Sequence, residues 1–414
     1  MTQSSREWTK STFGELLDFF DYKRVPVSSR ERSKRQGAYP YYGASGIVDY
    51  IDGYLFDGRY LLISEDGENL NSRKTPIAFF ACGKFWVNNH AHIVKAKPGV
   101  ADDDFLMYWL EGNDISGYIT GAAQPKLSQA NLRKIELSLP CLSEQRKITA
   151  ILSAYDDLIE NNTRRIHVLE EMARLIYDEW FVKFHFPGHE KAKMVESELG
   201  PVPEGWEIKK ATDALVINPK VTVPKDGEKP FLPMGSLADN SMLVGEPELR
   251  TGNSGSKFQN GDTLFARITP CLENGKTGYV QFLPSPGAVA FGSTEFIVLR
   301  SRTLCPEYVY LLARSAAFRD NAIKSMSGAS GRQRVHEECF EKVLLAQPDS
   351  GTLDLFSSVV SPMFKSIHTL ARKNSNLRQT RDLLLPKLIS GAVDVEELDI
   401  KAPAENGAAV AVSV

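Results

Sequence analysis

A regular series of apolar side chains runs through residues 148–180, at alternating steps of four and three. Nine of its ten positions are apolar or aromatic, and the exception is Asn162. A seven-residue repeat kept over more than four heptads is typical of a helix that packs along another helix. The series consists of Ile148, Leu152, Tyr155, Ile159, Asn162, Ile166, Leu169, Ala173, Ile176 and Trp180.

A second series with the same phase lies 208 residues further along the chain. Eight of its ten positions are apolar, so the chain carries two long helices that can bury their stripes against each other. We expect an antiparallel coiled coil of about 50 Å, at about 1.5 Å per residue. The series consists of Phe356, Val360, Met363, Ile367, Leu370, Asn374, Leu377, Arg381, Leu384 and Leu388.

Two asparagines interrupt these stripes. Asn162 is the fifth position of its series and Asn374 is the sixth of the other, so antiparallel packing places them opposite each other. A buried asparagine pair lowers stability but fixes the register and orientation of the helices. The alternative is that either asparagine lies at a hydrated edge of its helix.

The segments that precede the two helices also repeat. "GAAQPKLSQANLRKIELSLP" (121–140) aligns with "GASGRQRVHEECFEKVLLAQP" (328–348), which is one residue longer. Both run from a Gly-Ala turn through a polar loop and a short helix into a strand. Near the start of each half, Trp8 in "REWTK" corresponds to Trp206 in "GWEIK". The sequence therefore predicts a duplicated chain, with residues 186–205 as a polar connector.

Residues 38–110 and 230–300 hold aromatic and β-branched runs broken by glycine and aspartate, a pattern that indicates short strands and tight turns. The amino-acid sequences of these two segments differ, so we expect two related domains that contact different binding partners. The predicted fold class is α+β, with two strand-rich mixed α/β domains separated and joined by the two helices in a pseudo-twofold internal repeat. The predicted segments are a first domain (1–142), a central helical spacer (143–185), the connector (186–205), a second domain (206–350), a C-terminal helical spacer (351–397) and an unstructured tail (398–414).

The bulk composition constrains the partners and the compartment. The net charge is −3 and the pI near 6.2, which argues mildly against binding to nucleic acid, although "SSRERSKRQG" (28–37) is locally basic. No apolar run approaches the roughly 18 residues that span a bilayer, and the start of the chain lacks a signal-peptide core. Five cysteines without a C-x-x-C pair fit reduced thiols. These features predict a cytoplasmic protein.

Several long strings carry a resemblance to a known family. They are "YYGASGIVDYIDGYLFDGRYLLISEDG" (41–67) with "GKFWVNNHAHIV" (83–94), "GDTLFARITPCLENGK" (261–276) with "FGSTEFIVLR" (291–300), and "LSEQRKITAILSAYDDLIENNTRRI" (142–166). With these strings the chain resembles, over essentially its full length, the specificity subunit of type I restriction–modification systems. The resemblance implies two target recognition domains that each read one half of a bipartite, asymmetric double-stranded DNA site, with the helices setting the separation.

The resemblance also implies the partners and the cofactors. Two modification subunits dock on the helices and give an adenine-N6 methyltransferase that uses S-adenosylmethionine. Restriction subunits add motor and nuclease activity with ATP and Mg²⁺. The chain itself is then a non-catalytic subunit that binds no cofactor. Two other readings remain open: a coiled-coil scaffold whose globular ends bind protein or carbohydrate, and a single-chain restriction or modification enzyme.

Catalytic and metal motifs are incomplete in this sequence. "ENGKT" (273–277) lacks the first glycine of a phosphate-binding loop, because Pro270 stands there. "HEECF" (336–340) lacks the second histidine of a zinc-protease helix, and no [DNS]-P-P-[YFW] motif of amino-methyltransferases occurs. His90 and His92 could share a strand face as metal ligands, but no third ligand is near them in sequence. We therefore predict no catalytic residue and no metal site.

DNA contacts are expected from donor-rich side chains, because Arg, Lys, Asn and Gln pair with base edges in the major groove. The two polar loops before the short helices are the strongest candidates, since they recur at equivalent places. Tyr41 and Tyr42 could instead be core aromatics, Asn88-Asn89 a plain turn, and Arg59 a solvated strand residue. The candidates are Tyr41, Tyr42, Ser45, Arg59, Asn88, Asn89, His90, Gln124 and Lys126 in the first domain, and Arg267, Thr269, Asn274, Lys276, Thr294, Arg332, Gln333 and Arg334 in the second.

Trp180 and Phe181 end the first long helix with aromatic side chains, which are enriched at protein interfaces. They are either a docking surface for modification subunits or ordinary packing onto the second domain.

Overall fold

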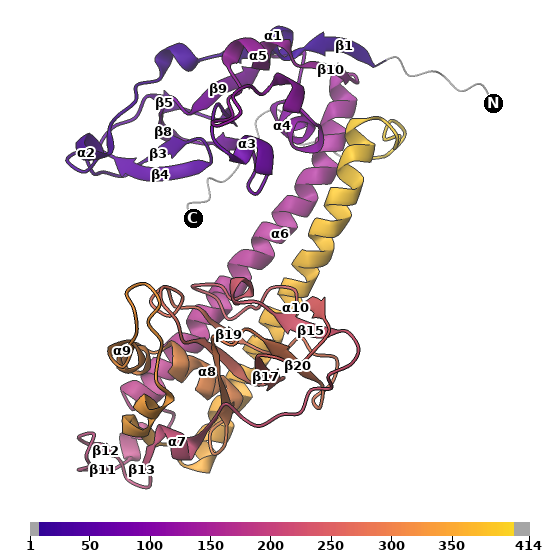
Figure 1. Ribbon diagram of the computed structural model, residues 1–414. Coiled ribbons are helices and arrows are strands. Elements are labelled where there is room, and N and C mark those ends of the chain that lie inside the picture. Colours follow the sequence, from indigo (N-terminus) through magenta and orange to yellow (C-terminus); the bar gives the residue numbers. More distant parts are fainter. Residues whose placement is uncertain (1–7, 401–414) are drawn as a thin grey trace. The chain divides into compact units, whose positions relative to one another are not determined.

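The computed structural model describes residues 8–400 and divides into two compact units (Figure 1). Unit 1 comprises residues 1–158 and 377–414, and unit 2 comprises residues 159–376. The two long helices, α6 (Leu142–Tyr177) and α10 (Ser350–Ile389), each contribute one part to unit 1 and one part to unit 2.

Unit 1 is built from short strands and helices around two four-stranded sheets, with strand orders β2-β9-β6-β7 and β4-β3-β8-β5, and a two-stranded pair β1-β10. Its elements before α6 are β1 (Thr9–Thr12), α1 (Phe13–Leu16), β2 (Leu17–Phe19), η1 (Asp21–Lys23), α2 (Ser29–Arg32), β3 (Tyr39–Gly43), β4 (Gly46–Ile51), β5 (Phe56–Asp57), β6 (Tyr60–Ser64), α3 (Asn69–Ser72), β7 (Ala78–Ala81), β8 (Lys84–Val87), β9 (Ala91–Ala96), α4 (Asp103–Gly112), η2 (Ser116–Tyr118), α5 (Gln129–Lys134) and β10 (Glu136–Leu139).

Unit 2 has the same plan, with strand orders β14-β21-β18-β19 and β16-β15-β20-β17 and the pair β13-β22. After α6 its elements are the π-helix η3 (Asp178–Val182), η4 (His189–Lys191), β11 (Met194–Val195), β12 (Val202–Pro203), β13 (Glu207–Lys210), α7 (Ala211–Ala214), β14 (Leu215–Ile217), β15 (Lys229–Leu232), η5 (Met234–Ser236), β16 (Glu248–Arg250), β17 (Ser256–Gln259), β18 (Thr263–Ala266), β19 (Thr277–Tyr279), β20 (Val289–Gly292), β21 (Phe296–Ser301), α8 (Pro306–Arg314), α9 (Ala316–Lys324), η6 (Glu337–Lys342) and β22 (Leu344–Gln347).

The strand topology confirms the predicted duplication. In each unit the second sheet contains one parallel pair, β3 with β8 and β15 with β20, and the other pairs are antiparallel. In each unit the two-stranded pair joins the first strand of the domain to the strand that leads into a long helix. Trp8 and Trp206 precede these first strands at equivalent places, as the sequence predicts.

The central strands explain why the apolar runs in these domains are continuous. In β6, Leu61 and Ile63 pack with the helices of unit 1, whereas Leu62 packs in a separate cluster with the second sheet. In β18, Phe265 and Leu264 divide in the same way between two clusters of unit 2. A strand covered on both faces has no polar side, so alternation is lost.

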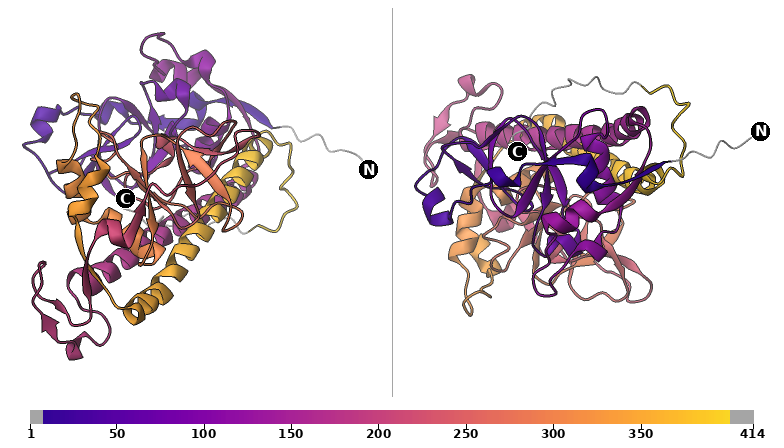
Figure 2. Two further views of the ribbon diagram at one scale, coloured as in Figure 1. Left: turned by 60° about the horizontal axis from the view of Figure 1, so that its bottom comes forward. Right: turned by 90° about the horizontal axis from the view of Figure 1, so that it is seen from above.

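Within each unit α6 and α10 lie antiparallel (Figure 2). In unit 2 the ring of Phe181 lies 4.8 Å from that of Phe356, near the end of α6 and the start of α10. In unit 1 Asp156 of α6 forms an ion pair with Arg381 of α10 at 2.5 Å. All twenty predicted seam residues are buried or half-buried, which confirms the heptad pattern. Arg381 can lie in this otherwise apolar seam because Asp156 neutralises its charge.

The C-terminal helical spacer is shorter than predicted. Helix α10 ends at Ile389 rather than near residue 397, and Gly391 follows with a φ of 74°. Gly391 packs directly on the indole of Trp8, and Val395 is fully buried in the core of unit 1. These apolar contacts favour a turn at Gly391 and an irregular segment packed on unit 1 over a continuation of the helix. The predicted unstructured tail lies, from residue 401 onward, outside the described residues.

Two further expectations concern the connector and the thiols. The predicted connector 186–205 contains the small hairpin of β11 and β12. All five cysteines fall within residues 8–400 and are free. In the same described range, no helix has both the length and the apolar character needed to cross a bilayer.

Candidate nucleic-acid interface

Three segments of unit 1 meet at one polar edge beyond the end of β6. They are residues 65–67 after β6, the β8–β9 turn (88–90), and the loop 120–127 before α5. Glu65 N–H donates to the His90 carbonyl at 2.9 Å, and Leu127 N–H donates to the Glu65 carbonyl at 2.8 Å. Thr120 and Lys126 exchange two backbone hydrogen bonds that close the loop on itself. We call these three segments the polar edge of unit 1.

Unit 2 builds the same polar edge from residues 267–269, the β20–β21 turn (293–295), and the loop 327–335. Arg267 N–H donates to the Glu295 carbonyl at 3.0 Å, and Val335 N–H donates to the Arg267 carbonyl at 2.8 Å. Ser327 and Arg334 exchange the pair of bonds that closes this loop. The loop is one residue longer than its counterpart, as the sequence alignment predicts, so the two edges share one backbone design.

The turn of each edge is fixed by a side-chain hydrogen bond. In unit 1 the Asn88 carbonyl oxygen of the side chain accepts from His90 N–H at 2.8 Å. In unit 2 the hydroxyl of Ser293 accepts from Glu295 N–H at 3.2 Å. Short polar side chains commonly hold turns through such local bonds. The residue between the two partners, Asn89 or Thr294, is therefore presented outward, and both are exposed.

An ion pair links the turn of each edge to a neighbouring segment. The turn contributes the histidine of the pair in unit 1 and the carboxylate in unit 2. In unit 1 His90 Nδ1 lies 2.8 Å from the Asp66 carboxylate, and in unit 2 Arg334 lies 2.7 Å from Glu295. The hydrogen bonds from Arg334 lower the pKa of the Glu295 carboxyl. Lys126 is the unit 1 residue equivalent to Arg334, and it forms an ion pair with Glu65 at 3.2 Å.

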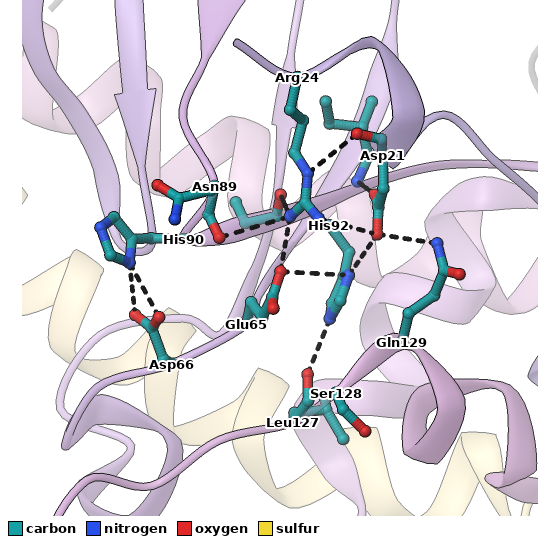
Figure 3. A network of polar contacts seen from close by, with 12 residues as sticks. Asp21, Arg24, Glu65, Asp66, Asn89, His90, His92, Leu127, Ser128 and Gln129 are labelled. Carbon is teal, nitrogen blue, oxygen red and sulfur yellow. Dashed lines mark hydrogen bonds and ion pairs between the residues drawn. The ribbon is translucent and has the colours of Figure 1, made fainter. Parts of the chain in front are cut away.

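Beneath the edge of unit 1 lies a charged cluster around His92, which is fully buried (Figure 3). Its Nδ1 lies 2.6 Å from Asp21 and its Nε2 lies 2.8 Å from the Leu127 carbonyl. Both ring nitrogens therefore face oxygen atoms, of the Asp21 carboxylate and of the Leu127 carbonyl. Arg24 completes the cluster with a 2.6 Å bond to Glu65.

The carboxyl groups of this cluster are stabilised in their charged form. Burial alone raises the pKa of Asp21, but the hydrogen bond and the charge of His92 outweigh it and the pKa lies below its ordinary value. Burial also raises the pKa of Glu65, and the hydrogen bond from Arg24 with nearby positive charges outweighs it in the same way. The cluster thus holds the end of the loop, through Leu127, onto strand β9.

Asp21, Glu65 and His92 offer donor atoms of the kind that bind a metal ion. However, the 2.6 Å contact between His92 and Asp21 is a hydrogen bond, too short for two ligands around one ion. Arg24 also lies against both carboxylates, at 2.6 Å from Glu65 and 3.5 Å from Asp21. The geometry favours a structural ion-pair cluster.

Unit 2 replaces this cluster with different chemistry at equivalent places. Asn218 accepts from Val298 N–H at 2.9 Å, as Asp21 accepts from Ile93 N–H at 2.8 Å. The Asn218 amide then donates to Glu337 at 2.6 Å. An arginine, Arg267, stands after β18 where unit 1 has a glutamate after β6. The two domains therefore share a backbone frame and differ in charge beneath it.

Most candidate residues of unit 1 have structural partners. Tyr41 is 1% exposed and its hydroxyl accepts from Val27 N–H, so its side chain is core and the prediction of a DNA contact is wrong. Tyr42 packs against Phe79 and Phe85 in the same core region. Arg59 forms an ion pair with Asp104 and stacks on Phe80, so it is not a free strand residue. Asn88, His90 and Lys126 take part in the polar edge, and Ser45, Asn89 and Gln124 are exposed without a side-chain partner among the described residues.

The second domain divides in the same way. Thr269 is 8% exposed and bonds to the backbone of Gln333, so both residues build the loop and the predicted Thr269 contact is wrong. Lys276 donates to the Leu237 carbonyl at 2.8 Å. Arg267 and Arg334 form ion pairs. Asn274, Thr294 and Arg332 are exposed and have no side-chain partner in the described part of the chain.

The aromatic pair that ends the first long helix packs inside unit 2. Phe181 is 7% exposed and contacts Trp206, Tyr308 and Phe356. Trp180 also contacts Phe356. The alternative of ordinary packing onto the second domain therefore holds. Sequence reasoning missed the acidic partners Glu65, Asp66 and Glu295, whose only signal is their place directly after a buried strand or within a tight turn.

The chain thus consists of two copies of one α+β domain, each with the same polar edge. Residues 5–171 match the family model of the type I restriction modification DNA specificity domain. The MjaIX type I restriction enzyme specificity subunit of Methanocaldococcus jannaschii is 25% identical over 359 residues, covering 82% of this chain and 80% of the relative. A putative type I restriction enzyme specificity subunit of Haemophilus influenzae, S.HindORF215P, is 36% identical over 151 residues, 36% of this chain and 37% of the relative.

The solved S subunit of the type I restriction–modification system from M. genitalium has the same fold, with a TM-score of 0.59 at 13% identity. The match covers 94% of this chain and 97% of that structure. The chain is thus similar in sequence to type I restriction enzyme specificity subunits, and the match to the DNA specificity domain model covers residues 5–171. The resemblance and the fold class stated from the sequence are confirmed.

Proposed function

We propose that this chain is the DNA-sequence-reading subunit of a type I restriction–modification complex, in which each domain reads one half of a bipartite, asymmetric site. The observation that carries the proposal is the pair of matched polar edges. Their backbone bonds coincide, whereas their exposed and buried polar side chains differ. Two domains with the same backbone and different polar side chains are suited to read two half-sites of different base sequence.

The partners and cofactors follow from the same proposal. The antiparallel helices dock modification subunits, which transfer the methyl group of S-adenosylmethionine to adenine N6, and restriction subunits supply ATP- and Mg²⁺-dependent cleavage. In unit 2, Val168, Met172 and Leu175 are exposed at helical spacing on α6. An exposed apolar stripe of this kind is typical of a protein interface and supports docking there. A cytoplasmic location follows from these partners.

The proposal is tested by purifying the chain with its modification subunits and mapping methylated adenines in genomic DNA by single-molecule sequencing. We expect methylation of one bipartite motif by the complex and none by the chain alone. Methylation without sequence preference, or methylation by the isolated chain, contradicts the proposal. The comparisons give no support to the scaffold alternative.

A variant of the loop in unit 2 adds a binding test. Replacement of both Arg332 and Arg334 by alanine removes two positive charges from the polar edge and is expected to weaken DNA binding. Unchanged affinity at physiological salt excludes this loop from the interface.

A further inference from the structure

Two exposed side chains recur at equivalent positions of the polar edges. The first is the tip of the turn, Asn89 in unit 1 and Thr294 in unit 2. The second lies two residues before the basic residue that closes the loop, Gln124 before Lys126 and Arg332 before Arg334. All four are exposed, and within residues 8–400 none of their side chains makes a hydrogen bond or an ion pair.

The backbone around these four residues is held firmly. The residue before each turn tip donates its N–H to a strand carbonyl, Asn88 to Tyr42 at 3.0 Å and Ser293 to Leu232 at 2.9 Å. The residue after each loop position is fixed to the segment beyond the central strand: the Pro125 carbonyl accepts from Gly67 N–H at 3.0 Å. The equivalent Gln333 carbonyl accepts from Thr269 N–H at 3.1 Å. Because the backbone at these positions is already ordered, binding costs only the rotamer entropy of the side chain and not the ordering of a loop.

The neighbouring polar residues are already engaged. In unit 1 His90 pairs with Asp66 and Lys126 pairs with Glu65. In unit 2 a single ion pair joins the turn to the loop, Glu295 with Arg334. Each of these side chains therefore already has an ion-pair partner within the folded chain. The other exposed candidates, Ser45 and Asn274, lie outside the three segments that form each polar edge, in the β3–β4 and β18–β19 connections.

We infer that Asn89 with Gln124, and Thr294 with Arg332, are the specificity-determining residues that contact base edges in the two half-sites. This inference rests on the proposed function. The two pairs differ in chemistry as two unlike half-sites require. Unit 1 presents two carboxamides, which match the edge of adenine, and unit 2 presents a hydroxyl and a guanidinium, of which the latter matches guanine.

The test uses the complete complex of this chain with its modification subunits, and it compares methylated motifs for the wild type, Asn89→Ala, Gln124→Ala, Thr294→Ala and Arg332→Ala. Each variant is expected to lose about 10- to 100-fold in preference at one base position of its own half-site. The opposite half-site serves as the internal control and keeps its preference. Because all four residues are exposed, the variants are expected to fold and assemble like the wild type.

Three outcomes are informative. A base preference that changes only in the half-site of the altered domain supports the inference. An unchanged motif, or a uniform loss of methylation across all sequences as a phosphate contact would give, overturns it while the wild-type motif still supports the proposed function. A wild-type complex without any motif refutes the proposed function itself. The exchange of Gln124→Arg with Arg332→Gln adds a gain-of-function arm, in which new preferred bases appear in both half-sites.

Discussion

The Asn162 side-chain amide donates to the Asn374 side-chain oxygen at 2.9 Å in the seam between α6 and α10. Asn374 in turn donates to the Ile159 carbonyl at 3.2 Å and to the Thr163 hydroxyl at 3.1 Å. Both asparagines are at most 9% exposed, so the pair is buried and not at a hydrated helix edge. This pairing follows from the seam positions alone. Its role in fixing the register stays a prediction.

Replacement of Asn374 by leucine is expected to lower the free energy of unfolding by about 1–3 kcal/mol, because the Asn162 amide then stays buried without its acceptor. Replacement of both asparagines by leucine removes the unpaired group and restores most of the stability, but it allows other registers. Unfolding in urea measures the first effect. Disulfide trapping between Ile166→Cys and Leu370→Cys, one helical turn away on each helix, measures the second. A double leucine variant that traps as efficiently as the wild type would show that the asparagines do not set the register.

The sequence predicts the long-range plan of this chain better than its local contacts. Heptad positions and the repeated segments before the helices depend only on spacing, so both could be recognised without a structure. Arg59 shows the limit: its partner Asp104 is distant in sequence, and no local pattern links them. Tyr41 and Tyr42 are adjacent in β3, and the burial of Tyr41 depends on contacts with Val27, Ile51 and Trp86, which are distant in sequence. Asn89, Gln124, Thr294 and Arg332, which are exposed at the two edges, were among the candidates because they are donors in loops, whereas the exposed Thr120 and Ser327 were not.

Helix α4 of unit 1 ends at Gly112, where the C-terminal part of α10 packs closely. A Cβ at this position would lie 2.4 Å from Ile389 Cδ1 and 3.1 Å from Leu385 Cγ. Gly112→Ala is therefore expected to lower the free energy of unfolding by about 1–3 kcal/mol, since Ile389 must leave its place in the core. Gly117→Ala is the matched control, because no atom lies within 4 Å of its added Cβ. Equal thermal stability of the two variants would argue against close packing at Gly112.

Acid is expected to destabilise unit 1 through the cluster beneath its polar edge. The pKa values of Asp21 and Glu65 are lowered in the folded chain, so both stabilise it fully above their ordinary pKa values of about 4. This stabilisation is lost as the pH falls through the folded values. Asp21→Asn keeps the acceptor for Ile93 N–H, as Asn218 does in unit 2, but it removes the charge beside His92.

The Asp21→Asn variant is expected to be less stable than the wild type near pH 7, by about 1–3 kcal/mol, and to show a weaker pH dependence between about pH 5 and 3. Urea unfolding over this range, together with hydrogen exchange of the Ile93 amide, reports on unit 1. Asp18→Asn, an exposed change on the adjacent strand β2, is the control. Parallel pH profiles for wild type and Asp21→Asn would remove the cluster as the source of acid sensitivity.

The exposed stripe on α6 leads to a prediction about assembly. Met172 and Leu175 are 43% and 48% exposed on α6, whereas Ala173 and Tyr177 of the same helix are buried. Replacement of both Met172 and Leu175 by glutamate places two charges in the proposed contact with a modification subunit. Burying unpaired charges is costly, so at least a 10-fold loss of affinity for that subunit is expected, with little change in the folding of this chain. Leu249→Glu, at a more exposed apolar residue of β16, controls for a general effect of surface charge. Co-purification and titration calorimetry measure the binding, and undiminished assembly of the double variant would place the docking surface elsewhere.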